Sequence, residues 1–199
     1  PGKLRSAFKK IGFEGMVEVA LFADILTLKE ALEFNKNIKK ESDFQLTSCC
    51  CPVWIKMIKK IYSTLIPHVP PSVSPMIACG RVVKKLVSQA VTVFIGPCLA
   101  KKAEAREPDI KDAIDYVLTF QEVNQIFGLM NINLKNLSDI DKEHSSETGR
   151  IYARSGGVSE AVNRTLSKIR KQDGIKLKYR VAQGPIECKK LLQELMEGK

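Results

Sequence analysis

Cysteines cluster in two short segments whose residue types could hold a metal or carry out redox chemistry. The first segment contains the adjacent Cys49, Cys50 and Cys51, and the second contains Cys98. Thiolates are ligands of iron–sulfur clusters and of zinc. The chain shows no export signal, so a disulfide framework is not expected. The two segments are therefore the candidate site for metal or redox chemistry.

Each cysteine segment is predicted to lie where a strand passes into a helix. Ligands bind open parallel sheets at the carboxyl ends of the strands, and the N-terminus of a helix favours a thiolate. Lys101 follows Cys98 by three positions and shares its helix face, so it could reach an anionic ligand beside a metal. Glu104 lies three positions further along that face and could pass protons. Two such turns facing each other would hold a soft metal centre.

The spacing of the cysteines leaves a plainer interpretation open. The chain has no Cys-x-x-Cys pair, and three adjacent cysteines cannot all bind one cubane comfortably. The alternative is a pair of buried structural thiols beside surface lysines, with Lys101 and Glu104 as an ordinary ion pair one helical turn apart. The isolated Cys79 and Cys188 are expected to be small buried side chains.

Strands and helices are predicted to alternate along the whole chain, which indicates the α/β class. Strands are expected at 16–20, 44–46, 90–95, 116–119 and 175–181. Helices are expected at 4–11, 23–34, 54–65, 120–127, 158–170 and 185–197, with further helices opening at Ser74-Pro75 and near Cys98. Thr47 and Ser48 are expected to cap the helix that follows them, and Ile25, Leu28 and Leu32 to share one face of theirs. We expect two lobes, residues 1–89 and 90–199, each with a parallel sheet flanked by helices, and a cleft for a cluster between them.

Composition limits the kinds of partner that the chain could bind. The formal net charge is +10, but the lysines come as scattered pairs with no interleaved aromatic residues, so nucleic acid is not expected. Solvated helix faces, or a basic surface that docks an acidic electron carrier, remain open. No apolar run approaches the roughly 20 residues of a membrane helix, and no signal peptide opens the chain, so a cytoplasmic protein is expected.

Two motifs resemble those of the iron-only hydrogenases. The first is Cys50-Cys51-Pro52-Val53-Trp54, with Cys49 where the family usually has serine, and the second is Pro97-Cys98 followed by Lys101 and Glu104. Other pieces occur in the family's order: Ala23-Asp24 before Glu30 and Glu33, Ser74-Pro75 before Gly80 and Lys84, Asp115 to Thr119 before Glu122, and Ser155 to Val158 before Glu160-Ala161. The resemblance covers nearly the whole chain, and the two cysteine motifs are its specific part.

The resemblance implies a cofactor and a role for each matching residue. The family's cofactor is a 4Fe-4S cubane linked to a two-iron unit that carries carbon monoxide, cyanide and a bridging dithiolate. Cys51 and Cys98 match the first two cubane ligands, and Cys50 matches the thiol that passes protons to the two-iron unit. Lys101 matches a residue that hydrogen-bonds a cyanide. Glu104 would contact the residues around the cofactor and not the cofactor itself.

Two glutamates match the family's proton path less securely. Glu30 and Glu33 lie in the predicted helix 23–34, where simple exposure to solvent is the plainer expectation. The family often has a serine of the same path near Pro70, and this chain has none there. Catalysis and hydrogen sensing therefore both remain open.

The activity implied is the reversible reduction of protons to hydrogen, with an electron carrier such as ferredoxin as partner. The family's third cysteine motif and its ferredoxin-like N-terminal segments do not occur in the sequence. We therefore expect a truncated domain that is inactive alone and holds no complete cluster. The alternatives are a hydrogen-sensing module and an iron–sulfur assembly relative. Such relatives tend to lack the proton-shuttle thiol, so Cys50 argues against the second.

Overall fold

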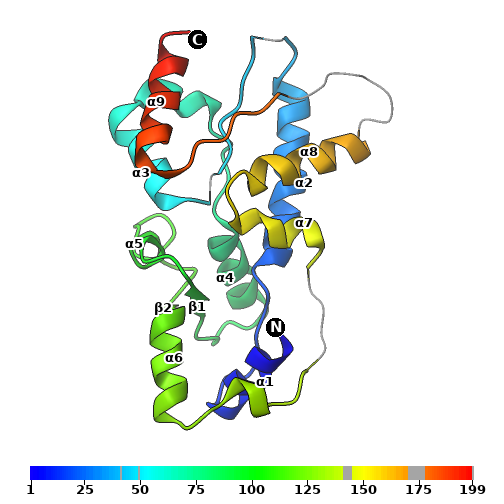
Figure 1. Ribbon diagram of the computed structural model, residues 1–199, viewed down its shortest axis with the longest axis vertical. Helices are drawn as coiled ribbons and strands as arrows, with labels where there is room; N and C mark the ends of the chain where they lie inside the picture. The colour runs from blue at the N-terminus through cyan, green and yellow to red at the C-terminus, as the bar shows by residue number, and fades with distance from the viewer. Residues whose placement is uncertain (41, 49, 141–144, 170–177, 199) are drawn as a thin grey trace. The chain divides into compact units, whose positions relative to one another are not determined.

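The computed structural model describes residues 1–40, 42–48, 50–140, 145–169 and 178–198. By their contacts the residues form two compact units, whose elements are labelled in Figure 1. Unit 1 comprises Pro1–Val19 and Met76–His144, and unit 2 comprises Ala20–Pro75 and Ser145–Lys199. This grouping differs from the predicted division into residues 1–89 and 90–199, since each unit is built from two separate stretches of chain.

Core packing explains why the units combine distant stretches of the sequence. In unit 1, Phe8 near the N-terminus belongs to one cluster with Val123 and Phe127. In unit 2, Leu192 near the C-terminus belongs to one cluster with Ile58. Burying apolar surface is the dominant favourable term in folding, so these contacts outweigh proximity along the chain.

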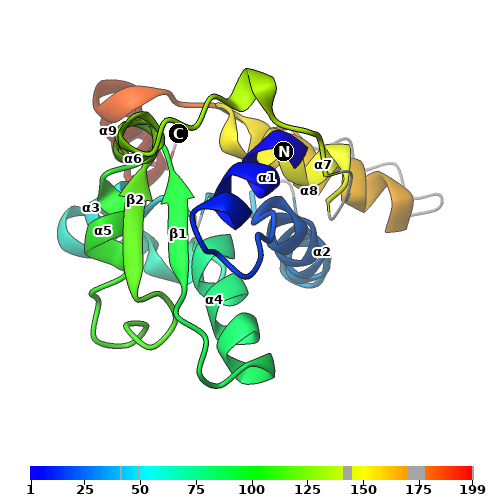
Figure 2. The same cartoon turned by 90° about the horizontal axis from the view of Figure 1, so that it is seen from below.

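Unit 1 contains a two-stranded parallel sheet. Its elements are α1 (Gly2–Lys10), α4 (Pro75–Leu86, which starts one residue before the unit), β1 (Val93–Gly96), α5 (Ala100–Glu104), β2 (Tyr116–Thr119), α6 (Phe120–Leu129) and the 3-10 turn η2 (Leu134–Asn136). Val93 pairs with Tyr116 and Gly96 with Thr119. Figure 2 shows the two strands side by side and pointing the same way, with α6 continuing from β2. Both strands thus end at the same edge of the sheet.

A polar network aligns the two strands at their starts. The Asp115 carboxylate accepts hydrogen bonds from the Thr92 backbone N–H at 2.7 Å and from the Thr92 hydroxyl at 2.9 Å. It also accepts one from Lys84 of α4 at 2.6 Å. Burial raises the pKa of the Asp115 carboxyl, but the bonds from Lys84 and Thr92 outweigh it and hold that pKa below its ordinary value. The network therefore fixes both the strand register and the position of α4.

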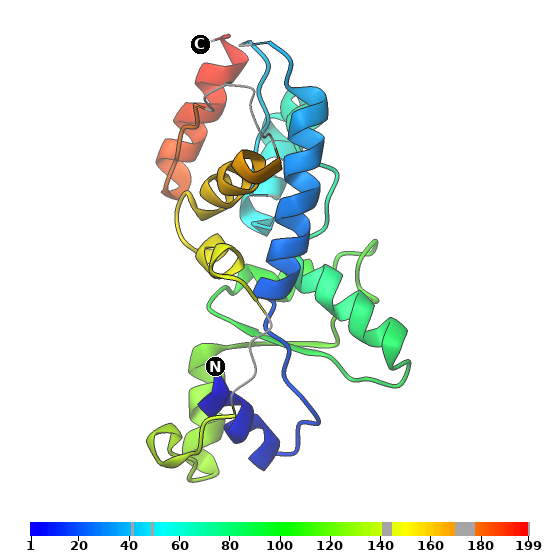
Figure 3. The ribbon, with the colours of Figure 1, turned by 90° about the vertical axis from the view of Figure 1, so that its right-hand side faces the viewer.

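The described residues of unit 2 form helices and contain no strand. These are α2 (Ala20–Asn37), α3 (Pro52–Ile61), η1 (Ser63–His68), α7 (Glu147–Arg150), η3 (Ile151–Ala153), α8 (Gly157–Ile169) and α9 (Gly184–Met196). The long helix α2 contacts both α7 and α8, and Figure 3 shows them beside it. Asp24 of α2 accepts bonds from the backbone N–H and the hydroxyl of Ser146, the residue that caps α7.

The α/β class is confirmed, and most predicted helices and two predicted strands are present. The strands 90–95 and 116–119 appear as β1 and β2. The predicted strands 16–20 and 44–46 are wrong, because neither segment has a neighbouring strand to complete its hydrogen bonds. Residues 175–177 of the last predicted strand lie outside the described residues, and 178–181 have no regular structure. A second parallel sheet is therefore missing from the described residues of unit 2.

Helix α2 presents to solvent a face that carries three of its large aliphatic side chains. Ile25, Leu28 and Leu32 are 54%, 49% and 51% exposed. The opposite face, which includes Leu26 and Glu30, is buried. The apolar pattern alone would have selected the wrong face as the core, because tertiary packing decides which side of a helix is covered.

Candidate functional site

The turn before α3 places Cys51 at the N-terminus of that helix. Cys51 occupies the N-cap position, directly before Pro52. Its backbone N–H donates to the Ser48 carbonyl at 3.0 Å, and Ser48 has a positive φ of 67°. The indole N–H of Trp54 donates to the Thr47 carbonyl at 3.0 Å. The prediction that Thr47 and Ser48 cap the helix is wrong. Both residues lie in the turn before the helix, where their carbonyls accept these bonds, and Cys51 occupies the N-cap position.

Cys50 lies against a small core of unit 2. It is partly buried and packs on the cluster formed by Ala23, Tyr152, Val158 and Ala161, which come from α2, η3 and α8. Cys49 lies outside the described residues. The cysteine turn therefore places neighbouring thiols at different positions: Cys51 at a helix N-terminus and Cys50 on an apolar wall.

Glu30 is buried completely, although simple exposure to solvent was the plainer expectation for this glutamate. Its side chain is 0% exposed, and the Tyr152 hydroxyl donates to Glu30 Oε1 at 3.5 Å. The Glu33 side chain is 24% exposed, and its Oε1 lies 3.8 Å from Lys29 Nζ. Burying a carboxyl costs free energy unless polar partners compensate. The fold therefore supplies a polar partner for this buried carboxyl, the Tyr152 hydroxyl.

Unit 1 brings Lys101 and Glu104 together as an ion pair. Lys101 Nζ donates to Glu104 Oε2 at 2.6 Å, and the two side chains are only 12% and 10% exposed. The two side chains therefore form an i,i+3 ion pair, as the plainer expectation had it, and this leaves the choice between the two interpretations open. Cys98 is exposed and lies two residues before α5, on the turn that follows β1. A role of Lys101 toward a ligand of a metal cluster stays a prediction.

Glu122 joins the helix that carries Lys101 to the end of β2, a role that the sequence analysis did not predict. Its Oε1 accepts from Lys102 Nζ at 2.5 Å, and its Oε2 accepts from the Thr119 backbone N–H at 2.7 Å and from the Thr119 hydroxyl at 3.0 Å. The Lys102 ammonium, with further help from the Thr119 donors, lowers the pKa of Glu122 to about 2. Glu122 thereby ties α5 to the start of α6. The Thr-x-x-Glu pattern of a capping box was the available signal.

Replacing Glu122 by glutamine is expected to change how stability depends on acid. A carboxyl whose folded-state pKa is lowered stabilises the fold above its ordinary pKa and loses that contribution as the pH falls through the folded value. The wild type should therefore lose stability between about pH 4.5 and pH 2 through this group, and Glu122→Gln should show a flatter curve there. Urea unfolding over a pH series measures this. Glu14→Gln, at an exposed position outside any helix, is the control; equal slopes for all three proteins would contradict the prediction.

The remaining cysteines do not extend the candidate site into a metal centre. Burial raises the pKa of the Cys79 thiol to about 11, as expected for a buried side chain. Cys188 is only partly buried; burial raises the pKa of its thiol, and the neighbouring Cys51 adds to the shift. The five described cysteines form no disulfide. Within the described residues, no group of three or more His, Cys, Asp or Glu side chains is placed to hold a metal ion.

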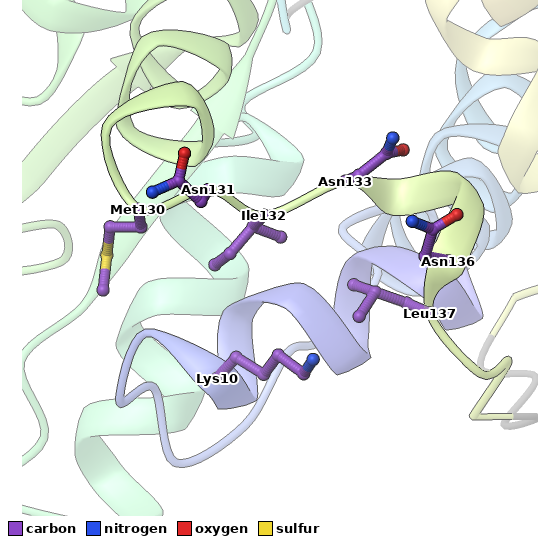
Figure 4. Close-up of a pocket in the computed structure, with 7 residues that line it drawn as sticks. All are labelled: Lys10, Met130, Asn131, Ile132, Asn133, Asn136 and Leu137. Carbon is purple, nitrogen blue, oxygen red and sulfur yellow. The ribbon is translucent and has the colours of Figure 1, made fainter.

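Two surface hollows lie away from the predicted site residues. One, of about 360 Å³, is lined by Lys10 and by residues between Met130 and Leu137. Figure 4 shows Asn131 and Asn133 turned away from α1, while Ile132 packs with the core of unit 1. The other, of about 410 Å³, is lined in part by Phe44 and His68. Their rings are stacked, with centroids 4.0 Å apart. Neither hollow is lined by a predicted site residue.

Comparison with known proteins identifies the family. The model of the C-terminal domain of the iron-only hydrogenase large subunit matches residues 1–199. The periplasmic Fe hydrogenase large subunit of Nitratidesulfovibrio vulgaris is 31% identical over 181 residues, which are 82% of this chain and 43% of that protein. A variant of the FeFe-hydrogenase HydA1 from Chlamydomonas reinhardtii superposes with a TM-score of 0.69 at 26% identity, covering 92% of this chain and 50% of that chain.

A relative with a different printed role is also similar. The cytosolic Fe-S cluster assembly factor NAR1 of Yarrowia lipolytica is 28% identical over 151 residues, which are 66% of this chain and 30% of that protein. The chain spans less than half the length of these curated relatives. It belongs to the iron-only hydrogenase family, to the part that forms the C-terminal domain of the large subunit. Among the described residues, no helix combines the length and apolar character that crossing a membrane requires.

Proposed function

We propose that this chain is part of a hydrogenase domain that interconverts protons and hydrogen at a 4Fe-4S cluster linked to a two-iron unit. The observation that carries the proposal is the arrangement around one core of unit 2. Cys50 packs on the cluster that contains Tyr152, and Tyr152 donates to the fully buried Glu30. A thiol and a buried carboxyl that share the Tyr152 core are groups that can pass protons to a buried metal centre.

The donor set present in the chain suits an iron–sulfur cluster but does not complete one. Cys51 and Cys98 each precede a helix, and thiolates are the usual ligands of such clusters. Two thiols account for only part of a four-cysteine ligand set, so the other ligands must come from elsewhere in a longer protein. The chain alone is then expected to hold no complete cluster. When bound, the cluster supplies the redox chemistry of the reaction.

The protein's own residues would handle protons and charge around that cluster. Cys50 would give and take a proton at its Sγ, and Glu30 and Glu33 would hold protons on the way to it. The Lys101 ammonium would hydrogen-bond an anionic ligand of the two-iron unit. Its ion pair with Glu104 at 2.6 Å would keep the ammonium in place until that ligand is present.

The similarity to assembly factor NAR1 supports a second candidate, an iron–sulfur assembly relative. The two candidates differ in whether proton-transfer residues are needed. The family resemblance implies that assembly relatives tend to lack the proton-shuttle thiol, so the presence of Cys50 beside the Tyr152 core favours the hydrogenase.

Hydrogen evolution from reduced viologen by the longer protein, matured with its cluster, tests the proposal. We expect hydrogen by gas chromatography and a two-iron unit by its carbonyl and cyanide infrared bands. Those bands with very slow turnover would indicate a hydrogen sensor. Iron without those bands and without hydrogen would indicate the assembly candidate and contradict the proposal.

The electron partner and the compartment complete the proposal. The net charge of +10 suits an acidic electron carrier such as ferredoxin, whose docking would be favoured by complementary charge. A cytoplasmic location also stays a prediction, since the relatives include one named as periplasmic and one named as cytosolic.

A further inference from the structure

Tyr152 joins the two residues on which the proposed proton transfer depends. Its side chain is 7% exposed and lies in the cluster against which Cys50 packs. Its hydroxyl donates to Glu30 Oε1 at 3.5 Å, across 122 positions of sequence. Tyr152 therefore hydrogen-bonds the buried carboxyl and also belongs to the cluster against which the thiol packs.

The surrounding fold fixes the position of the Tyr152 ring. Tyr152 lies in η3, and the chain then turns through Gly156, which has a positive φ of 70°. A Cβ on Gly157 would come within 1.9 Å of the Ile151 carbonyl oxygen, so only glycine allows α8 to start this close to η3. Ala161 of α8 is 0% exposed, and so short a side chain leaves room for the ring. The ring is therefore clamped between α2 and α8.

The cost of burying polar groups explains why a hydroxyl lies next to the Glu30 carboxyl. Transferring a hydroxyl or a carboxyl from water into a core is costly unless each finds a hydrogen-bond partner. A phenylalanine would fill the same space without that cost. The Tyr152 hydroxyl meets the Glu30 carboxyl, and this contact restricts the directions in which that carboxyl can point.

We propose that Tyr152 is a positioning residue for Glu30, whose hydroxyl holds the Glu30 carboxyl beside the wall that carries Cys50. The inference rests on the proposed function for its catalytic consequence. The hydrogen bond itself belongs to this chain and can be tested without any cluster.

The first test is nuclear magnetic resonance of this chain labelled with ¹³C at the glutamate carboxyl. Loss of one resonance in Glu30→Gln assigns the signal of Glu30. Tyr152→Phe keeps the ring and removes the hydroxyl, and it should move that signal while the signals of exposed glutamates stay. Tyr62→Phe, at a tyrosine that is 6% exposed in a different core cluster of unit 2, is the matched control and should leave the Glu30 signal in place. A Glu30 signal unchanged in Tyr152→Phe overturns the inference.

The second test is turnover in the longer, cluster-loaded protein. Losing this long hydrogen bond, worth about 0.5–1 kcal/mol, should lower kcat by about twofold to fivefold in Tyr152→Phe, with KM for the electron donor unchanged. Full turnover in Tyr152→Phe, when Glu30→Gln is slow, overturns the positioning role. Full turnover in Glu30→Gln would instead show that proton transfer does not need Glu30, which contradicts that part of the proposed function. The resonance test of the hydrogen bond is independent of this outcome.

Discussion

Replacing Cys50 by alanine in the longer, cluster-loaded protein is expected to leave its iron content intact and to remove most of its turnover. A general acid or base within hydrogen-bond reach of a reacting group contributes about 10²–10⁴-fold to the rate. Cys50 packs on the Tyr152 cluster of unit 2, whereas its neighbour Cys51 occupies the N-cap of α3. The two thiols should therefore have separate roles despite being adjacent.

Cys51→Ala is the matched comparison, because it removes the same atoms one position away. We expect Cys51→Ala to lose the cubane, since a metal ligand is replaced. Iron and sulfide analysis measures cluster content, and hydrogen evolution measures turnover. If Cys50→Ala lost its iron while Cys51→Ala kept both iron and activity, the assignment of ligand and proton carrier would be reversed. If both variants kept both, Cys49 would become the candidate ligand.

Leu192→Ala should destabilise unit 2 by about 2–5 kcal/mol, the cost of a cavity where a leucine was buried. Leu192 of α9 is 0% exposed and packs in one cluster with Ile58 of α3 and with Tyr62 and Leu65. That cluster packs against α3, the helix that Cys51 caps at its N-terminus. The loss should therefore reach the candidate site and not only the C-terminal helix.

Urea unfolding followed by fluorescence measures this effect, because Trp54 is the single tryptophan and packs against the same cluster. Ile186→Ala is the control, as Ile186 lies on the same helix and is 85% exposed. An exposed substitution of this kind should change the free energy of unfolding by less than about 0.5 kcal/mol. Equal unfolding midpoints for Leu192→Ala and Ile186→Ala would mean that α9 does not support α3.

Elements with strong local signals were predictable from the sequence. The run 116–119 forms β2 as predicted, and the helix after it starts at Phe120. The helix predicted from residue 158 begins one residue earlier, at Gly157, and the helix predicted to open at Ser74-Pro75 begins at Pro75. In each case the signal is a property of neighbouring residues, such as a fixed proline φ or a glycine at a position that no side chain fits.

Segments without a local signal were not predictable in the same way. The predicted strand 16–20 is irregular over 16–18 and reaches α2 at Ala20. Residues 44–46 contribute a backbone bond from the Leu46 N–H to the His68 carbonyl at 2.8 Å. A strand exists only when a second strand completes its hydrogen bonds, and composition does not say whether that partner is present.

The sequence by itself determined the two cysteine motifs, the α/β class, the position of Cys51 at the start of a helix and that of Cys98 shortly before one. These follow from residue types and spacings along a few turns of chain. Only the tertiary structure decided that Glu30 is buried, that Tyr152 reaches it, and that Glu122 joins Lys102. Glu30 and Tyr152 lie on different helical segments, as do Glu122 and Lys102, and which segments meet depends on how the whole chain buries its apolar surface. No local pattern encodes that choice, because each helix could present more than one face to a core.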